Sequence, residues 1–463
     1  MDLQKKMFGE LKDKKIFDLA RTYAFSYADN IDKMDVYPSD ENLKNLINFD
    51  ESIPENSTSA ENIISQLNKF GSPATTAQTG GRYFGFVNGG AIPVSIAAKW
   101  LADFWDQNGG LYVTSPINAK LEMICEQWLK ELFNLPEETV AGFVSGTSTA
   151  NFCGIVAARF RLLKNLGWDV NQKGLNGAPK IRIIAHQQVH SSIAKALALA
   201  GFGKENVEWV EADDQGRMIL EKLPKLDSSC LVFLQAGNVN TGAFDHFSGI
   251  CKKANEVGAW VHIDGAFGLW AGASKSLSHL TEGMELASSW ATDGHKTLNA
   301  PYDSAVVLCK DSEALISALQ ATGEYIIYSE QKDPMLCTPE MSKRSRAIEM
   351  WATIKYLGKS GIDEMVTGFH LRAKQLEEGL RNNGFTIVND VVFNQVLVSC
   401  GNSELTKSTL LNLQKSGEIW CGGSTWKGEA MIRVSVCSWA TTEEDIERTI
   451  AAFVQARGGL LHS

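Results

Sequence analysis

The stretch Trp260-Val261-His262-Ile263-Asp264-Gly265-Ala266 decides the fold class, because an apolar run ends there on a carboxylate followed by two small residues. Apolar runs of the same kind occupy 181–185, 231–234 and 305–308. Longer stretches with helical periodicity separate them, as at 192–201 and 247–258. Strands that alternate with helices predict a parallel sheet with helices on both faces.

Ligands of such sheets bind at the carboxyl ends of the strands, where Asp264 lies. Lys296 follows 32 residues later, in Asp293-Gly294-His295-Lys296-Thr297. A lysine amine can form a Schiff base with the aldehyde of pyridoxal 5′-phosphate (PLP), and a carboxylate can keep its pyridine nitrogen protonated. The pair therefore predicts a PLP site. A helix cap at Asp264 and a solvated lysine at 296 are the simpler interpretation of these two residues alone.

Two further segments suit the same cofactor. Ser145-Gly146-Thr147-Ser148-Thr149 opens a predicted helix, and a helix N-terminus with hydroxyls binds anions such as a phosphate. Ser148 could instead be a hydrolase nucleophile in a GxSxG-like turn, although Ala150 replaces the last glycine, or part of an ordinary helix cap. His190 follows a strand and opens a helix, where it could stack on a flat ring, transfer protons or be merely structural.

Composition limits the remaining function classes. The net charge of −10 argues against nucleic acid as a partner. No apolar run approaches the ~20 residues of a membrane span, and the first residues do not resemble a signal peptide. Nine dispersed cysteines without a CxxC pair argue against a disulfide framework and a metal cluster, so we expect no metal and a cytoplasmic location.

The chain of 463 residues is long enough for two or three domains. Residues 1–75 have amphipathic helical periodicity and must pack on the rest of the chain or on a second copy. Residues 76–335 form the predicted large domain. Residues 336–463 form a predicted smaller α+β domain, with helices at 343–356 and 442–457 and strands at 385–388, 395–398 and 431–437.

Four motifs carry a resemblance to a known family: His262-Ile263-Asp264-Gly265-Ala266-Phe267-Gly268, His295-Lys296 with Pro301-Tyr302-Asp303-Ser304, Val189-His190-Ser191-Ser192, and Arg433-Val434-Ser435-Val436-Cys437. In these the chain resembles the group II PLP-dependent amino-acid decarboxylases, which include the aromatic-amino-acid and glutamate decarboxylases. The resemblance implies the type I (aspartate-aminotransferase-like) PLP fold. It also implies a homodimer with the active site at the interface and N-terminal helices that clasp the partner.

The resemblance also implies residue roles. Lys296 would form the Schiff base, Asp264 would pair with the pyridine nitrogen and His190 would stack on the ring. Tyr325 would return a proton to Cα. The other implied cofactor contacts are Ser148, Thr149, Asn240, Ala266 and His295. The candidate substrate contacts are Phe86, Val87, Asn88, Arg344 and Arg346.

We therefore expect decarboxylation of an L-amino acid to the amine and carbon dioxide. Phe86 and Val87 favour an aromatic substrate, whereas Asn88 and the two arginines would accept an acidic or polar one. Asn88 also replaces a proline common in aromatic decarboxylases, and Thr297 replaces an aromatic residue common after the lysine. The alternatives are an aminotransferase, an aldehyde-forming oxidative decarboxylase, a serine hydrolase that uses Ser148, or a binding protein without turnover.

Overall fold

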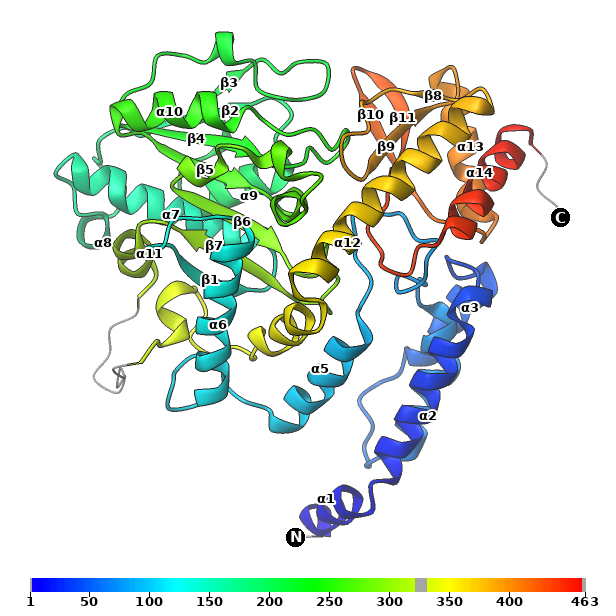
Figure 1. Ribbon diagram of the computed structural model, residues 1–463. Helices are drawn as coiled ribbons and strands as arrows, with labels where there is room; N and C mark the ends of the chain where they lie inside the picture. The colour runs from blue at the N-terminus through cyan, green and yellow to red at the C-terminus, as the bar shows by residue number, and fades with distance from the viewer. Residues whose placement is uncertain (1, 321–330, 460–463) are drawn as a thin grey trace.

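The computed structural model describes residues 2–320 and 331–459, and a seven-stranded sheet forms the middle of its larger lobe (Figure 1). Its strands are β1 (Val140–Val144), β2 (Arg182–His186), β3 (Val207–Val210), β4 (Cys230–Gln235), β5 (Trp260–Asp264), β6 (Ser289–Asp293) and β7 (Ala305–Cys309). The order is β1-β7-β6-β5-β4-β2-β3. The strands from β3 to β6 pair in parallel, while β7 is antiparallel to both neighbours. The predicted mostly parallel sheet is confirmed.

Both faces of this sheet are buried, because successive side chains of a strand point to opposite faces. Ile184, Val232 and Val261 belong to one hydrophobic core, which also contains α10 (Phe247–Val257) and α6 (Pro116–Leu132) side chains. Their neighbours Ile183, Leu231 and Phe233 belong to a second core. The helices that contribute to this second core are α7 (Thr147–Asn165), α9 (Ser191–Leu199) and α11 (Ser312–Leu319). The sheet therefore lies between two helical layers.

A second, smaller sheet follows in the C-terminal part of the chain. It consists of β8 (Thr386–Ile387), β9 (Gln395–Ser399), β10 (Gly422–Trp426) and β11 (Glu429–Ser435), all antiparallel, in the order β10-β11-β9-β8. The helices α13 (Ser403–Lys415) and α14 (Glu443–Arg457) pack with it in one hydrophobic core. The predicted α+β character is confirmed, and β10 is an additional strand.

The long helix α12 (Ala347–Asn382) joins the two sheets (Figure 1). Gly358 interrupts it with a left-handed φ of 59°. Side chains between Ile348 and Val366 pack in the core of the large sheet, whereas Leu376 and Leu380 pack in the small one. The predicted boundary between 335 and 336 therefore precedes a segment that still packs on the large sheet.

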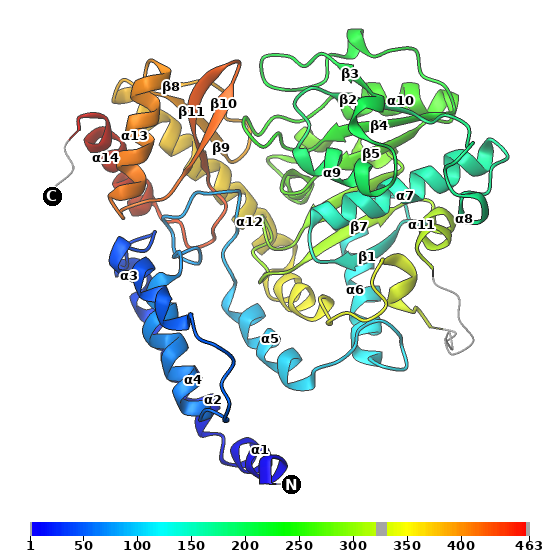
Figure 2. The same ribbon diagram turned by 180° about the vertical axis from the view of Figure 1, so that it is seen from behind.

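The N-terminal helices reach away from the rest of the chain (Figures 1 and 2). They are α1 (Asp2–Asp13), α2 (Lys15–Asn30), α3 (Asp40–Lys44) and α4 (Ala60–Gln66), and none of them contains a buried residue. Ring contacts at 5.0 and 6.0 Å join Phe17 and Phe25 of α2 to α5 (Pro93–Trp105). No helix in the described ranges is long and apolar enough to cross a membrane.

Candidate active site

The carboxyl ends of three adjacent parallel strands carry polar side chains. Gln235 ends β4, Asp264 ends β5 and Asp293 ends β6. Gln235 pairs with Asp264, which pairs with Ala291 of β6, so the three ends lie side by side. Lys296 follows β6 after two residues. The structure thus brings the predicted acid and lysine to one edge of the sheet.

The carboxylate of Asp264 is held by hydrogen bonds at both oxygens. Its Oδ2 accepts from the Asn151 amide nitrogen at 3.1 Å, and the Ser192 hydroxyl lies 3.5 Å away. Its Oδ1 accepts from the backbone N–H of Ala266 at 3.2 Å. The residue is only 4% exposed. Asp264 is therefore fixed in orientation before any ligand binds.

The amine of Lys296 lies 3.2 Å from Oδ2 of Asp293, a buried residue. The Oδ1 of the same carboxylate accepts from the backbone N–H of Thr147, the first residue of α7, at 2.7 Å. This carboxylate connects the lysine to the helix start that carries Ser148 and Thr149. Asp293 was missed as a site residue, because Ser289-Trp290-Ala291-Thr292 does not have the pattern of an apolar strand.

His190 caps α9, as the sequence indicated. Its Nδ1 accepts from the backbone N–H of Ser192 at 3.2 Å and lies 2.8 Å from the Ser192 hydroxyl. Although the ring is exposed at the site, desolvation by nearby protein atoms lowers the pKa of His190. Asp264 raises this pKa, whereas Lys296 and Arg433 lower it further. The neutral imidazole is therefore the favoured form at neutral pH.

His295 immediately precedes Lys296 on the same loop. Its Nδ1 accepts from the backbone N–H of Ser304 at 3.2 Å, and its Nε2 lies 3.6 Å from Oδ1 of Asp293. The ring stacks on Tyr302 with centroids 4.1 Å apart. Burial lowers the pKa of His295. A neutral ring with its proton on Nε2 satisfies these contacts.

Asn299 fixes the loop that carries Lys296. Its amide nitrogen donates to the carbonyl oxygens of Lys296, Thr297 and Cys437, and its Oδ1 accepts from the backbone N–H groups of Gly90 and Trp439. A Cβ added at Gly89 would lie 2.1 Å from the Lys296 carbonyl oxygen. Two distant segments of the chain, 89–90 and 437–439, therefore meet at the lysine loop.

The structure places Asn240 apart from the hydrogen bonds around Asp264. Asn240 lies five residues beyond the end of β4, and its Oδ1 accepts from the Ser424 hydroxyl of β10 at 2.6 Å. The strand-end residue beside Asp264 is Gln235, which the sequence analysis missed. Turning the Gln235 amide lets its oxygen accept from the backbone N–H of His190 at 2.9 Å.

The predicted substrate segment lies against the lysine loop. The backbone N–H of Gly89 donates to the His295 carbonyl oxygen, and Asn88 Oδ1 accepts from the Tyr302 hydroxyl at 2.9 Å. Phe86 is 61% exposed and stacks on Trp420 with centroids 5.5 Å apart. Val87, in contrast, is 1% exposed and packs in the core, so its side chain does not face an open site.

The two predicted substrate arginines are engaged with carboxylates. Arg344 pairs with Asp303 at 2.8 Å and with the buried Glu349. Arg346 pairs with the other oxygen of Asp303 at 3.1 Å, and its Nε and Nη1 have no hydrogen-bond partner among the described residues. Arg344 is thus occupied, whereas Arg346 retains donors.

A third arginine, Arg433, was quoted in the sequence motif without a role. Its guanidinium donates to the Val239 carbonyl oxygen at 3.2 Å and, within 2–320 and 331–459, forms no ion pair. Desolvation by burial lowers the pKa of Arg433, and its charge acts on His190 and Tyr83. A desolvated cation without a carboxylate beside the predicted site is suited to binding an anionic group.

Ser148 and Thr149 open into a pocket of about 320 Å³ that Phe152, Lys195 and Leu199 also line. No hydrogen bond joins Ser148 to a histidine in the described part of the chain, which argues against a hydrolase nucleophile. Tyr325, the predicted proton donor, lies outside the described residues.

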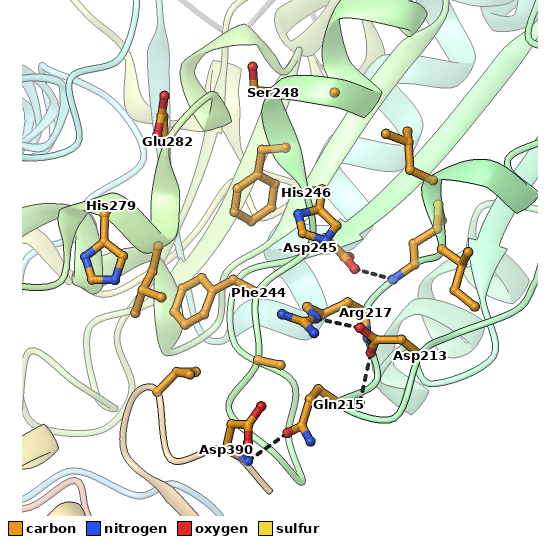
Figure 3. Close-up of a pocket in the computed structure, with 18 of the residues that line it drawn as sticks. Asp213, Gln215, Arg217, Phe244, Asp245, His246, Ser248, His279, Glu282 and Asp390 are labelled. Atoms are coloured by element: carbon orange, nitrogen blue, oxygen red, sulfur yellow. Dashed lines mark hydrogen bonds and ion pairs between the residues drawn. The ribbon is translucent and has the colours of Figure 1, made fainter.

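A larger pocket of about 710 Å³ lies elsewhere, and Figure 3 shows it. Its lining includes His246, His279 and the ion pair of Asp213 with Arg217 (2.7 Å). Among the described residues, its lining includes no lysine and none of the predicted site residues. The larger cavity is therefore not the predicted active site.

Known proteins resemble this chain in sequence and in fold. The model of a family described as "Pyridoxal-dependent decarboxylase conserved domain" matches residues 41–400. The aromatic-L-amino-acid decarboxylase of Bacillus atrophaeus is 27% identical over 340 residues, which are 71% of this chain and 68% of the relative. The acidic amino acid decarboxylase GADL1 of Mus musculus is 28% identical over 332 residues, 68% of this chain and 59% of the relative.

Phenylacetaldehyde synthase of Arabidopsis thaliana is 22% identical over 447 residues, 89% of each chain. Among solved structures, Oryza sativa TDC with PLP and tryptamine superimposes with a TM-score of 0.89, at 20% identity, and covers 98% of this chain and 99% of that one. The structure of mouse CSAD gives a TM-score of 0.88, also at 20% identity, and covers 96% and 98%. The predicted type I PLP fold is confirmed.

Proposed function

Since the chain belongs to the pyridoxal-dependent decarboxylase family and is thus a PLP-dependent carboxy-lyase of amino acids, we propose that it converts an aromatic L-amino acid to its amine and carbon dioxide. The choice of an aromatic substrate rests on Phe86. It exposes 61% of its surface on the segment that contacts the Lys296 loop, and it is backed by Trp420. An aromatic side chain of the substrate would bury that surface.

The described residues fit PLP. When bound, PLP supplies an electron sink for the charge left at Cα as carbon dioxide departs. Lys296 would hold the cofactor covalently and Asp264 would pair with its ring nitrogen, while the exposed ring of His190 would cover one face. Ser148 and Thr149, at the start of α7, would bind the phosphate.

Arg433 is the proposed anchor of the substrate carboxylate. Its guanidinium pairs with no carboxylate in the described ranges, and it lies near enough to His190 to lower the pKa of that imidazole. A fork of guanidinium donors binds a carboxylate in a fixed orientation. Arg433 would thus orient the bond that breaks relative to the cofactor ring.

Product analysis tests the proposed reaction. The PLP-loaded protein is incubated separately with phenylalanine, tyrosine, tryptophan and L-DOPA, and with glutamate, aspartate, cysteine sulfinate and 2,4-diaminobutyrate. Amine and carbon dioxide in equal amounts from an aromatic substrate are expected. Turnover of the non-aromatic substrates alone, or keto acid as the product, would overturn the proposal. A Lys296→Ala variant should lose the borohydride-reducible PLP adduct.

The choice of amine over aldehyde depends on a proton donor for Cα, and we assign that role to Tyr325 from the resemblance. The wild-type protein is expected to release amine without hydrogen peroxide. A Tyr325→Phe variant should shift the product toward aldehyde. Aldehyde from the wild-type protein would instead group it functionally with relatives such as the phenylacetaldehyde synthase.

We also propose a homodimer. Phe8 and Leu11 of α1 and Leu101 and Phe104 of α5 are each more than half exposed in the single chain, which favours burial against a second copy. Light scattering should give twice the mass of 50.7 kDa, and the double variant Leu101→Asp, Phe104→Asp should shift the measured mass toward that of a single copy.

Nine free, buried cysteines support a reducing cytoplasm, which cell fractionation would test.

A further inference from the structure

A line of buried side chains, joined by hydrogen bonds, ends on the carboxylate of Asp264. The indole nitrogen of Trp260 donates to the Ser289 hydroxyl at 2.9 Å. That hydroxyl lies 2.7 Å from Nδ1 of His262, whose Nε2 lies 2.9 Å from Oδ1 of Asn151. The amide nitrogen of Asn151 then donates to Oδ2 of Asp264 at 3.1 Å. Side chains from β5, β6 and α7 are thus joined in one line.

The Asp264 carboxylate sets the direction of these hydrogen bonds. A carboxylate can only accept, so the Asn151 amide gives it an N–H and turns its oxygen to Nε2 of His262, which must carry a proton to donate. A neutral ring then accepts at Nδ1 from the Ser289 hydroxyl, which itself accepts from the Trp260 indole. Burial lowers the pKa of His262 to about 3, so the ring remains neutral at physiological pH.

The surrounding packing accommodates this arrangement. His262, Asn151 and Ser289 are completely buried. Gly154 lies one turn after Asn151 on α7, and a Cβ added there would lie 2.4 Å from Cε1 of His262. The helix therefore approaches the imidazole at the one position where it has no side chain. A second branch leads from Asn151 to the Ser192 hydroxyl (3.3 Å), which lies 2.8 Å from Nδ1 of His190.

We propose that Asn151, fixed by His262, is a positioning residue that orients the Asp264 carboxylate toward the pyridine nitrogen of PLP. This inference rests on the proposed cofactor role of Asp264. The amide group requires Oδ2 of Asp264 to be an acceptor, because an amide N–H cannot accept a hydrogen bond. The histidine in turn prevents the amide from rotating, since a rotated amide would direct its oxygen at the carboxylate.

The test compares Asn151→Leu with Asn394→Leu. Asn394 is equally buried, but it donates to the Val436 carbonyl oxygen, away from Asp264. PLP affinity is measured by titrating each apoprotein, the visible absorbance of each loaded protein is recorded, and urea unfolding gives the stability of both. Asn151→Leu should weaken PLP binding at least tenfold and change the absorbance. Asn394→Leu should leave both nearly unchanged despite a similar loss of stability.

Equal effects of the two substitutions on PLP affinity would overturn the proposal and leave Asn151 as a core residue only. Nitrogen NMR of histidine in the apoprotein provides a second measurement. It should show His262 protonated on Nε2 alone from pH 8 to pH 5. A proton on Nδ1 would contradict the proposed hydrogen-bond directions. Neither readout needs turnover, so a negative product analysis would not affect them. Failure of the wild-type protein to bind PLP would instead overturn the proposed function.

Discussion

The amine of Lys296 and the carboxylate of Asp293 lie 3.2 Å apart, and this carboxylate also accepts the first backbone N–H of α7 from Thr147. The site therefore contains two carboxylates with different surroundings. Asp264 is held by an amide and a backbone N–H, whereas Asp293 lies between a cation and the helix start proposed to bind the PLP phosphate. A negative charge at that helix start opposes the binding of another anion.

Asp293→Asn should increase PLP affinity and speed covalent uptake of PLP by the apoprotein. The asparagine oxygen can still accept from Thr147, so the helix start is kept while the charge is removed. The expected gain is roughly tenfold, equivalent to ~1.4 kcal/mol. Stopped-flow absorbance after mixing apoprotein with PLP measures it. Slower uptake would mean that the ion pair with Lys296 prepares the lysine for reaction.

Arg433→Met should impair substrate use and leave the cofactor bound. Loss of a charge-assisted hydrogen bond costs roughly 1.5–3 kcal/mol, so kcat/KM should fall about ten- to a hundredfold. Arg217→Met is the control, because Arg217 lines the pocket in Figure 3, outside the site. A loss of PLP affinity in Arg433→Met with unchanged KM would contradict the assignment to the substrate carboxylate.

Asn299→Ala should loosen the lysine loop. The substitution removes the amide that hydrogen-bonds the backbone of Lys296, Thr297, Cys437, Gly90 and Trp439. The backbone groups left without a partner cost roughly 1–3 kcal/mol each. Asn389→Ala is the matched control, because the Asn389 side chain also forms hydrogen bonds to backbone groups, those of Thr241, Gln395 and Leu397. Both variants should unfold at lower urea concentration, but only Asn299→Ala should weaken PLP binding. Equal PLP affinities would argue against loop positioning.

Gly154→Ala should destabilise the protein by about 1–3 kcal/mol, because the new methyl group would overlap the His262 ring. Gly368 lies in α12 with no atom within 4 Å of an added Cβ. Gly368→Ala should therefore stabilise the helix by roughly 0.5–1 kcal/mol. Thermal unfolding of both variants measures the difference in sign. A neutral Gly154→Ala would show that α7 can move away from β5.

The buried His262 should make stability depend on acidity. Its pKa is lowered from the model-peptide value of 6.5 to about 3, so the unfolded chain binds a proton that the folded one does not. The free energy of unfolding therefore has its full value above pH 6.5. It decreases as the pH falls from 6.5 toward 3, by up to ~1.4 kcal/mol per pH unit. Urea unfolding between pH 7 and pH 4 should show a shallower dependence in His262→Gln. The exposed His279→Gln should retain the wild-type dependence.

The sequence by itself determined the fold class and predicted Asp264 and Lys296 as the reacting pair. An apolar strand that ends on Asp264 and a lysine 32 residues later indicated PLP, and the motifs around His190 and His295 indicated the family. These features are local: a continuous apolar run, a helix start and a short spacing are visible without knowing how the strands are ordered. For the same reason β5 was predicted at 260–264 with the observed bounds.

Only the tertiary structure decided which other polar residues reach the site. Ser289 and Asp293 lie in the central strand β6, where their polar side chains form hydrogen bonds with Trp260, His262 and Thr147. Because of these polar residues, β6 lacks the apolar run by which a strand is recognised in a sequence. Register, rather than distance along the chain, placed Gln235 beside Asp264 and left Asn240 against the small sheet. The roles proposed for Arg433 and Asn299 rest on contacts between segments more than a hundred residues apart. Such contacts depend on how the two sheets pack together, and no local pattern of residues encodes that packing.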